Sequence, residues 1–84
     1  MTGMRVRLLL FAVLRDITGK SEVELALPDG ARAVDVWQTL CADHEALSGY
    51  RKPPMTAVNQ DYVEPERVLH DGDELAFIPP VAGG

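Results

Sequence analysis

RVRLLLF (residues 5–11) and SEVELAL (residues 21–27) are the two stretches of sequence that decide the fold class. In both, apolar side chains recur at every second position, which predicts β-strands. The first stretch becomes apolar on both faces toward Phe11, so we expect both of its faces to be partly covered. The second alternates cleanly and is predicted to be half-buried. Together they predict an antiparallel hairpin, joined through a short helix over residues 12–18 that ends at Gly19 in the left-handed conformation.

The clearest helix signal runs from Ala33 to about His44. Its apolar side chains fall on one stripe, at Val34, Trp37, Leu40 and Cys41. No Ser or Thr precedes the helix, so the usual N-cap is missing, although Asp35 complements the helix dipole. Residues 45–48 are expected to add one turn, and further strands are predicted at 55–59, 62–63 and 74–78, separated by turns at 59–61 and 69–73. This element order predicts an α+β fold in which one main helix crosses one face of a sheet.

Length, charge and cysteine content exclude several classes of function. A chain of 84 residues forms one domain with a small core, which leaves little room for a deep catalytic pocket. The net charge of −5 disfavours binding to nucleic acid and to anionic membranes. Cys41 is the single cysteine, which excludes an internal disulfide and a cysteine metal cluster. Since no apolar run approaches about 20 residues and no signal peptide is evident, we expect a cytoplasmic protein.

The chemically interesting segment follows Ile78, where the sequence reads Pro79, Pro80, Val81, Ala82, Gly83, Gly84. The two prolines remove strand donors, so we expect residues 1–78 to form the domain and residues 79–84 an extended tail. A terminal Gly-Gly lacks side chains, can enter a narrow tunnel and leaves the terminal carboxylate unhindered. ATP can convert such a carboxylate to an acyl-adenylate, from which sulfide gives a thiocarboxylate and an amine gives an amide. The alternative is a frayed end without function.

Three blocks of sequence resemble the small subunit of molybdopterin synthase, the MoaD family. They are Phe11-Ala12-x-x-Arg15 with Gly19, the stretch AVNQ at residues 57–60, and LHDGDELAFIPPVAGG at residues 69–84, which is the most specific. The resemblance extends from the first strand to Gly84. It implies a β-grasp, ubiquitin-like fold with a mixed sheet of about five strands, and a role as sulfur carrier in molybdenum cofactor biosynthesis.

The same resemblance implies a mechanism centred on Gly84, with Gly83 beside it. An activating enzyme similar to ubiquitin E1 uses ATP to adenylate Gly84, and sulfur transfer then yields a thiocarboxylate. The tail enters the large subunit of molybdopterin synthase and donates sulfur to cyclic pyranopterin monophosphate, in a heterotetramer of two small and two large subunits. The pterin-binding active site then belongs to the large subunit. This chain is expected to bind no cofactor and no metal itself and to act as a non-catalytic sulfur donor.

A partner-binding surface is predicted beside the root of the tail. If Leu10 and Phe77 are core residues, alternation places Phe11 and Ile78 on the opposite face of the sheet. We expect these two residues, Tyr62 and tail residues 79–82 to contact partner proteins. The alternative for the apolar side chains is a second, minor core under a loop. Arg15 is either a surface ion pair or a contact to the activating enzyme.

The remaining conspicuous side chains have simpler interpretations. Trp37 and Cys41 fall on the helix stripe and are predicted to be core residues; the alternative for Cys41 is a persulfide or a nucleophile. His44 and His70 lack companions at metal-ligand spacing. Asp71 and Asp73 flank Gly72 and are predicted to form a turn, because the rest of a calcium-loop pattern is absent.

Three rival functions stay open from the sequence. A ubiquitin-like modifier would use the same adenylate to join Gly84 to lysines of other proteins. A sulfur carrier for thiamine synthesis or tRNA thiolation would use the same thiocarboxylate. A β-grasp binding module would carry the tail as an inert end.

Overall fold

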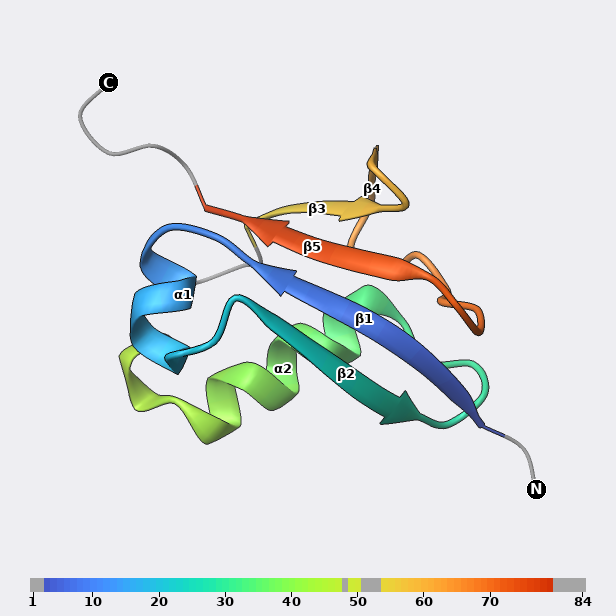
Figure 1. Ribbon diagram of the computed structural model, residues 1–84, viewed down its shortest axis with the longest axis horizontal. Coiled ribbons are helices and arrows are strands. Elements are labelled where there is room, and N and C mark those ends of the chain that lie inside the picture. The colour runs from blue at the N-terminus through green and yellow to red at the C-terminus, as the bar shows by residue number, and fades with distance from the viewer. Residues whose placement is uncertain (1–2, 48, 51–53, 80–84) are drawn as a thin grey trace.

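The chain forms a mixed β-sheet in the computed structural model, which describes residues 3–47, 49–50 and 54–79. Five strands are found in that part of the chain, namely β1 (Met4–Leu10), β2 (Glu22–Leu27), β3 (Met55–Val58), β4 (Asp61–Val63) and β5 (Glu74–Ile78). Their order across the sheet is β2-β1-β5-β3-β4 (Figure 1). Strands β1 and β5 are parallel, and the other neighbouring pairs are antiparallel. The first and last strands of the chain therefore lie side by side at the centre.

The predicted β1–β2 hairpin is confirmed, with Met4 opposite Leu27 and Leu9 opposite Glu22. The connection holds helix α1 (Val13–Thr18), which Gly19 ends with φ 78°, as predicted. Strand β1 stops at Leu10, one residue earlier than expected. The reason is Ala12, whose φ of 53° and ψ of −125° turn the chain out of the strand before α1.

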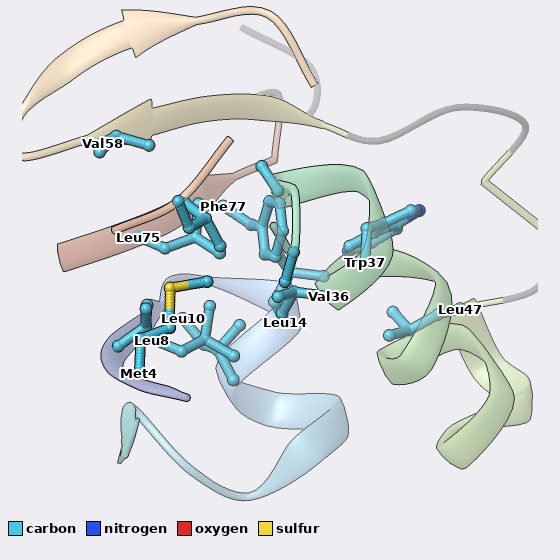
Figure 2. Close-up of a cluster of buried hydrophobic side chains, with 14 residues drawn as sticks. Met4, Leu8, Leu10, Leu14, Val36, Trp37, Leu47, Val58, Leu75 and Phe77 are labelled. Carbon is cyan, nitrogen blue, oxygen red and sulfur yellow. The ribbon is translucent and has the colours of Figure 1, made fainter. Parts of the chain in front are cut away.

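The core lies between one face of the sheet and the helices α1 and α2 (Ala33–Asp43) (Figure 2). Phe77 is fully buried at its centre, and its ring centroid lies 5.2 Å from that of Trp37 in an edge-to-face arrangement. Helix α1 contributes Leu14, and the 3-10 turn η1 (Glu45–Leu47) contributes Leu47, both fully buried. Edge-to-face pairs add about 0.5–1.5 kcal/mol beyond the area they bury. The prediction that Trp37 is a core residue is confirmed.

Helix α2 differs from its predicted form in two respects. Its most deeply buried side chains are Ala33, Val36 and Trp37, whereas Val34 is only half-buried, so the stripe is rotated from the predicted one. The start of the helix is also capped. The Asp35 carboxylate accepts a hydrogen bond from the Arg32 backbone N–H at 2.9 Å, which replaces the missing Ser or Thr cap by the reciprocal half of a capping box.

This arrangement confirms the α+β, β-grasp architecture with one main helix on one face of a mixed sheet. It leaves the other face of the sheet without a covering helix, as Figure 1 shows for the described elements. No helix within the described residues is long and apolar enough to cross a bilayer.

Candidate functional site

The chain leaves the sheet from its centre, because β5 lies between β1 and β3. Leu75 and Phe77 anchor β5 in the core, and Ile78 is its last residue. Pro79 follows outside the strand and is buried, so the sheet ends where the prolines predicted. Five predicted site residues, Pro80, Val81, Ala82, Gly83 and Gly84, lie outside the described residues.

Beside this exit, apolar side chains gather on the uncovered face of the sheet. The strand register puts Ile78 opposite Met55, Ala76 beside Leu9, and Ala57 opposite Tyr62. Cross-strand partners point to the same face, and Leu75 and Phe77 alternate with Ile78 toward the core. We call this surface the apolar sheet face, and its members are Leu9, Phe11, Met55, Tyr62 and Ile78.

Three of these side chains are well exposed: Phe11 is 43% exposed, Met55 54% and Tyr62 67%. Ile78 and Leu9 are half-buried. Ile78 directly follows the core residue Phe77 on the opposite face of β5, as alternation predicts, and Phe11 follows Leu10, the residue paired with Phe77. That the apolar sheet face binds a partner stays a prediction.

Met55 and Leu9 were missed as members of this surface. Alternation along residues 5–11 puts Leu9 on the face opposite to Leu8 and Leu10, but its contribution to a patch depends on its neighbour in β5. Met55 begins a four-residue strand, too short for alternation to reveal which face is buried. Its position opposite Ile78 is a consequence of pairing between segments more than 20 residues apart, which no local pattern indicates.

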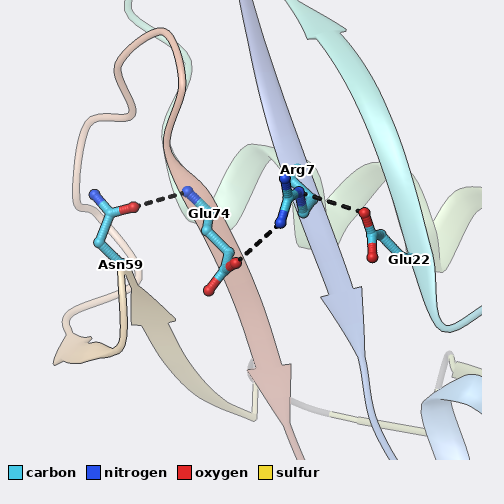
Figure 3. A network of polar contacts seen from close by, with 4 residues as sticks. All are labelled: Arg7, Glu22, Asn59 and Glu74. Atoms are coloured by element: carbon cyan, nitrogen blue, oxygen red, sulfur yellow. Dashed lines mark hydrogen bonds and ion pairs between the residues drawn. The ribbon is translucent and has the colours of Figure 1, made fainter.

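The other half of the uncovered face is charged. Arg7 of β1 lies between two acidic side chains, with its Nε 3.3 Å from Glu22 of β2 and its Nη1 3.5 Å from Glu74 of β5 (Figure 3). Arg5 pairs with Glu24 at 3.3 Å. These pairs are exposed and contribute only about 0–1 kcal/mol each to stability. They divide the face into a charged half and the apolar sheet face, which adjoins the end of β5.

The turn before β5 is built by the acidic residues that the sequence assigned to it. The Asp73 carboxylate is almost buried and accepts hydrogen bonds from the His70 backbone N–H at 2.7 Å and from Asn59 Nδ2 at 3.0 Å. Asp71 Oδ1 accepts from the Arg5 N–H at 2.9 Å. Gly72 supplies the positive φ of 86° that the turn requires. Both carboxylates therefore hold the turn in shape, which confirms their predicted role.

Cys41 lies on the side of α2 that packs against the core. Its side chain is half-buried and packs against the core, with Sγ 3.9 Å from the Leu47 carbonyl oxygen. Burial raises the pKa of the Cys41 thiol, which disfavours the nucleophilic thiolate. These contacts confirm the core interpretation of this residue.

The apolar sheet face carries hydrocarbon, thioether and phenol side chains, of the kinds that are enriched in protein interfaces. Within residues 3–47, 49–50 and 54–79, no three His, Cys, Asp or Glu side chains lie close enough to hold a metal ion. The structure thus places a partly exposed apolar surface next to the end of β5.

Comparison with known proteins identifies relatives of this chain. The model of the ThiS family matches residues 8–84. The molybdopterin synthase sulfur carrier subunit of Chlamydomonas reinhardtii is 41% identical over 83 residues, which cover 96% of this chain and all of that protein.

Two solved structures share the fold. One, assigned to molybdopterin converting factor subunit 1 of Pyrococcus furiosus, has a TM-score of 0.80 and 31% identity, and the match covers 93% of this chain and 99% of that one. The small archaeal modifier protein 1 of Haloferax volcanii has a TM-score of 0.79 and 26% identity, over 94% of this chain and all of that one. The chain therefore belongs to the ThiS family, and its curated relatives place it among the molybdopterin synthase sulfur carrier subunits, the MoaD family.

Proposed function

We propose that this chain is the sulfur-carrier small subunit of molybdopterin synthase and that its reactive group is the carboxyl of Gly84. The observation that carries the proposal is the extent of the match. The family model runs to residue 84, and the 41% identical carrier subunit is covered over its full length. The terminal Gly-Gly is therefore inside the shared sequence.

The proposed chemistry uses ATP on an activating enzyme. A Gly84 carboxylate oxygen attacks the α-phosphorus of ATP and pyrophosphate leaves, which gives an acyl-adenylate. A sulfide nucleophile then attacks the acyl carbon and AMP leaves, which gives the thiocarboxylate. In this mechanism the nucleotide is bound by the activating enzyme, which resembles ubiquitin E1. The chain itself binds neither ATP nor a metal.

The proposed partners are that activating enzyme and the large subunit of molybdopterin synthase. The apolar sheet face supports this, because exposed aromatic and methionine side chains are enriched in protein interfaces. Tyr62, Met55 and Phe11 would rest on the partner while the segment after Ile78 enters its active site, where the thiocarboxylate donates sulfur to cyclic pyranopterin monophosphate. We place this reaction in the cytoplasm, in keeping with the single unpaired Cys41.

A protein-modifier function is the second candidate, because a solved relative at 26% identity is a small archaeal modifier protein. The adenylate is common to both functions, and only the nucleophile differs. Sulfide leads to a carrier, whereas the amino group of a lysine leads to an isopeptide bond.

Intact-mass measurement separates the candidates. Chain purified from its host should show replacement of one oxygen by sulfur, a gain of about 16 Da, and the thiolated chain mixed with a large subunit and cyclic pyranopterin monophosphate should yield molybdopterin. Adducts that survive denaturing gels, without a thiolated species, would favour the modifier. A thiolated chain that fails with pyranopterin but supplies sulfur for thiazole or tRNA would assign it to one of those pathways instead.

A further inference from the structure

A second surface lies on the opposite edge of the sheet from β4. Strand β2 is the outer strand there, and between it and α2 runs a groove of about 660 Å³. The side chains of Val23, Leu25 and Leu27 line it on the β2 side, together with Ala26, and Leu40 contributes from α2. Val23, Leu25, Leu27 and Leu40 are half-buried and rest against the core, so their outer surfaces remain available to a ligand.

Among the described residues, no strand pairs with the outer edge of β2. The Leu10 N–H donates to the Ser21 carbonyl oxygen at 2.9 Å, which determines which residues of β2 form hydrogen bonds with β1. Because antiparallel ladders alternate, Val23, Leu25 and Leu27 bond to β1, and the backbone groups of the residues between them face away from it. The Arg7 N–H follows the same alternation: it points away from β2 and donates at 3.0 Å to the Asp73 carbonyl oxygen on the other side of β1.

We infer that this groove binds an extended peptide segment of a partner protein, which adds to β2 as a further strand. Its backbone would pair with the outward groups of Glu22, Glu24 and Ala26, as in β-augmentation. Residues of the added strand that stand opposite Val23, Leu25 and Leu27 would point to the same face, into the groove. The segment should therefore carry apolar side chains at alternate positions.

The rim of the groove determines the charge of the segment. Asp29 lies at the end where β2 leads into α2, and Asp43 lies at the last turn of α2. Neither takes part in an ion pair among the described residues, while Lys20 is the single Lys or Arg side chain of the lining. Asp35, also on the rim, is bound to Arg32. Lys20 precedes β2 and therefore lies at the Asp43 end of the groove, so one cation stands against two carboxylates. An apolar segment flanked by Lys or Arg complements the net negative charge of this rim.

A second copy of the chain fits the edge less well. In an antiparallel pair of β2 strands centred on Glu24, the Glu24 side chains of the two copies would stand directly opposite each other. Like charges in that position destabilise strand pairing. The chain as a whole is also acidic, so it repels itself and attracts basic segments.

Binding of a synthetic nonapeptide tests the inference. The probe has valine at three alternate positions, threonine between them and two lysines at each end. With ¹⁵N-labelled full chain, the amide signals of Glu22, Glu24 and Ala26 should shift on addition of the peptide, and added salt should weaken the binding. No shift of β2 amides at millimolar peptide, or shifts confined to the apolar sheet face, would overturn the proposal.

Three variants sharpen the test. Glu24→Pro removes one outward N–H without removing a bond to β1, and should weaken peptide binding by about fivefold, the effect of one net hydrogen bond. Asp43→Lys should weaken it as well, whereas Asp61→Lys, on the far strand β4, should not. Ile78→Asp should also leave peptide affinity unchanged, which separates this groove from the apolar sheet face. If Glu24→Pro fails to fold, Asp43→Lys and Asp61→Lys decide alone.

Sedimentation of the unlabelled chain measures its oligomeric state, which is the last part of the test. The proposal requires a monomer at the concentrations used for peptide binding. A dimer that Glu24→Pro dissociates would assign the edge to a second copy and overturn the peptide proposal.

Discussion

Asn59 and Asp73 join two turns that are 14 residues apart, through a hydrogen bond of 3.0 Å from Asn59 Nδ2 to Asp73 Oδ1. Asn59 Oδ1 in turn accepts the backbone N–H of Glu74 at 3.0 Å (Figure 3). The turn after β3 is thereby fixed to the start of β5. We call these two hydrogen bonds of the Asn59 side chain the clasp. The clasp holds the start of β5, and Ile78 lies at the other end of the same strand.

We predict that Asn59→Ala lowers the free energy of unfolding by about 2–3 kcal/mol. Two hydrogen bonds are lost at about 1 kcal/mol each, and alanine tolerates the φ of 52° less well than asparagine. Urea denaturation measures the change. Asn59→Gly loses the same bonds but accepts the positive φ, so it should be less harmful than alanine; equal stability of Asn59→Ala and the parent chain would contradict the clasp.

The backbone at Ala12 predicts a stabilising substitution. Its φ of 53° and ψ of −125° lie in a region that favours glycine, so Ala12→Gly should raise the free energy of unfolding by about 1 kcal/mol. Ala42→Gly, the same change at an exposed position of α2, should lower it by about 1 kcal/mol. Thermal melts of both variants give the comparison, and loss of stability in each would show that Ala12 is not strained.

The N-cap of α2 predicts a specific acid sensitivity. The hydrogen bond from the Arg32 backbone N–H stabilises the ionised carboxylate, and so lowers the pKa of Asp35 in the folded chain. The resulting stability is present above the unfolded pKa of about 4 and is lost as the pH falls through the lower folded value. Asp35→Asn should therefore lose less stability than the parent chain between pH 5 and pH 3, roughly the range of a carboxyl titration.

Urea denaturation at both pH values measures this difference. Glu66→Gln, which removes an exposed carboxylate from a loop, is the matched control and should keep the acid sensitivity of the parent. A variant Asp35→Asn that is as acid-sensitive as the parent would contradict the capping role.

Substitutions on the apolar sheet face should weaken partner binding more than they weaken the fold. Ile78→Asp and Phe11→Asp place a charge where the partner would exclude water, and each should raise the Kd for the large subunit by at least about tenfold. Val68→Asp introduces the same charge at another exposed apolar side chain, outside the sheet strands, and should leave the Kd unchanged. Calorimetry against the large subunit, with a thermal melt of each variant, measures both quantities. Parallel loss of binding and melting temperature would indicate that Phe11 and Ile78 belong to a minor core.

Removal of Gly84 should abolish sulfur donation while the melting temperature stays that of the full chain. Gly83→Trp should nearly abolish it as well, because a bulky side chain blocks entry to a narrow active site. Gly49→Trp is the matched control, since a Cβ added at Gly49 meets no atom of the described residues within 4 Å. Molybdopterin formation in the reconstituted reaction is the measurement, and unchanged product with either tail variant would overturn the mechanism.

The local sequence pattern was sufficient to predict much of the secondary structure of this molecule. Alternation placed β1, β2 and β5, helical spacing placed α2, and Gly19 and Gly72 marked turns that the structure contains. Such signals are visible in sequence because the period of a strand or helix is set by the backbone within a few residues. The proposed chemistry of Gly84 also rests on sequence, since a terminal carboxylate needs no other residue of the chain to define it.

Only the tertiary structure determined which segments, distant in the sequence, lie next to each other. Pairing of β1 with β5 and of β5 with β3 brought Leu9, Met55 and Ile78 onto one uncovered face, and among the described residues no strand covers the outer edge of β2 next to α2. Asp35 capped a helix that lacked the usual cap residue, because its side chain could reach the Arg32 N–H. These features depend on long-range register and on which face a helix covers, and the free energy that selects them comes from burying Phe77 and its neighbours, not from any single local segment.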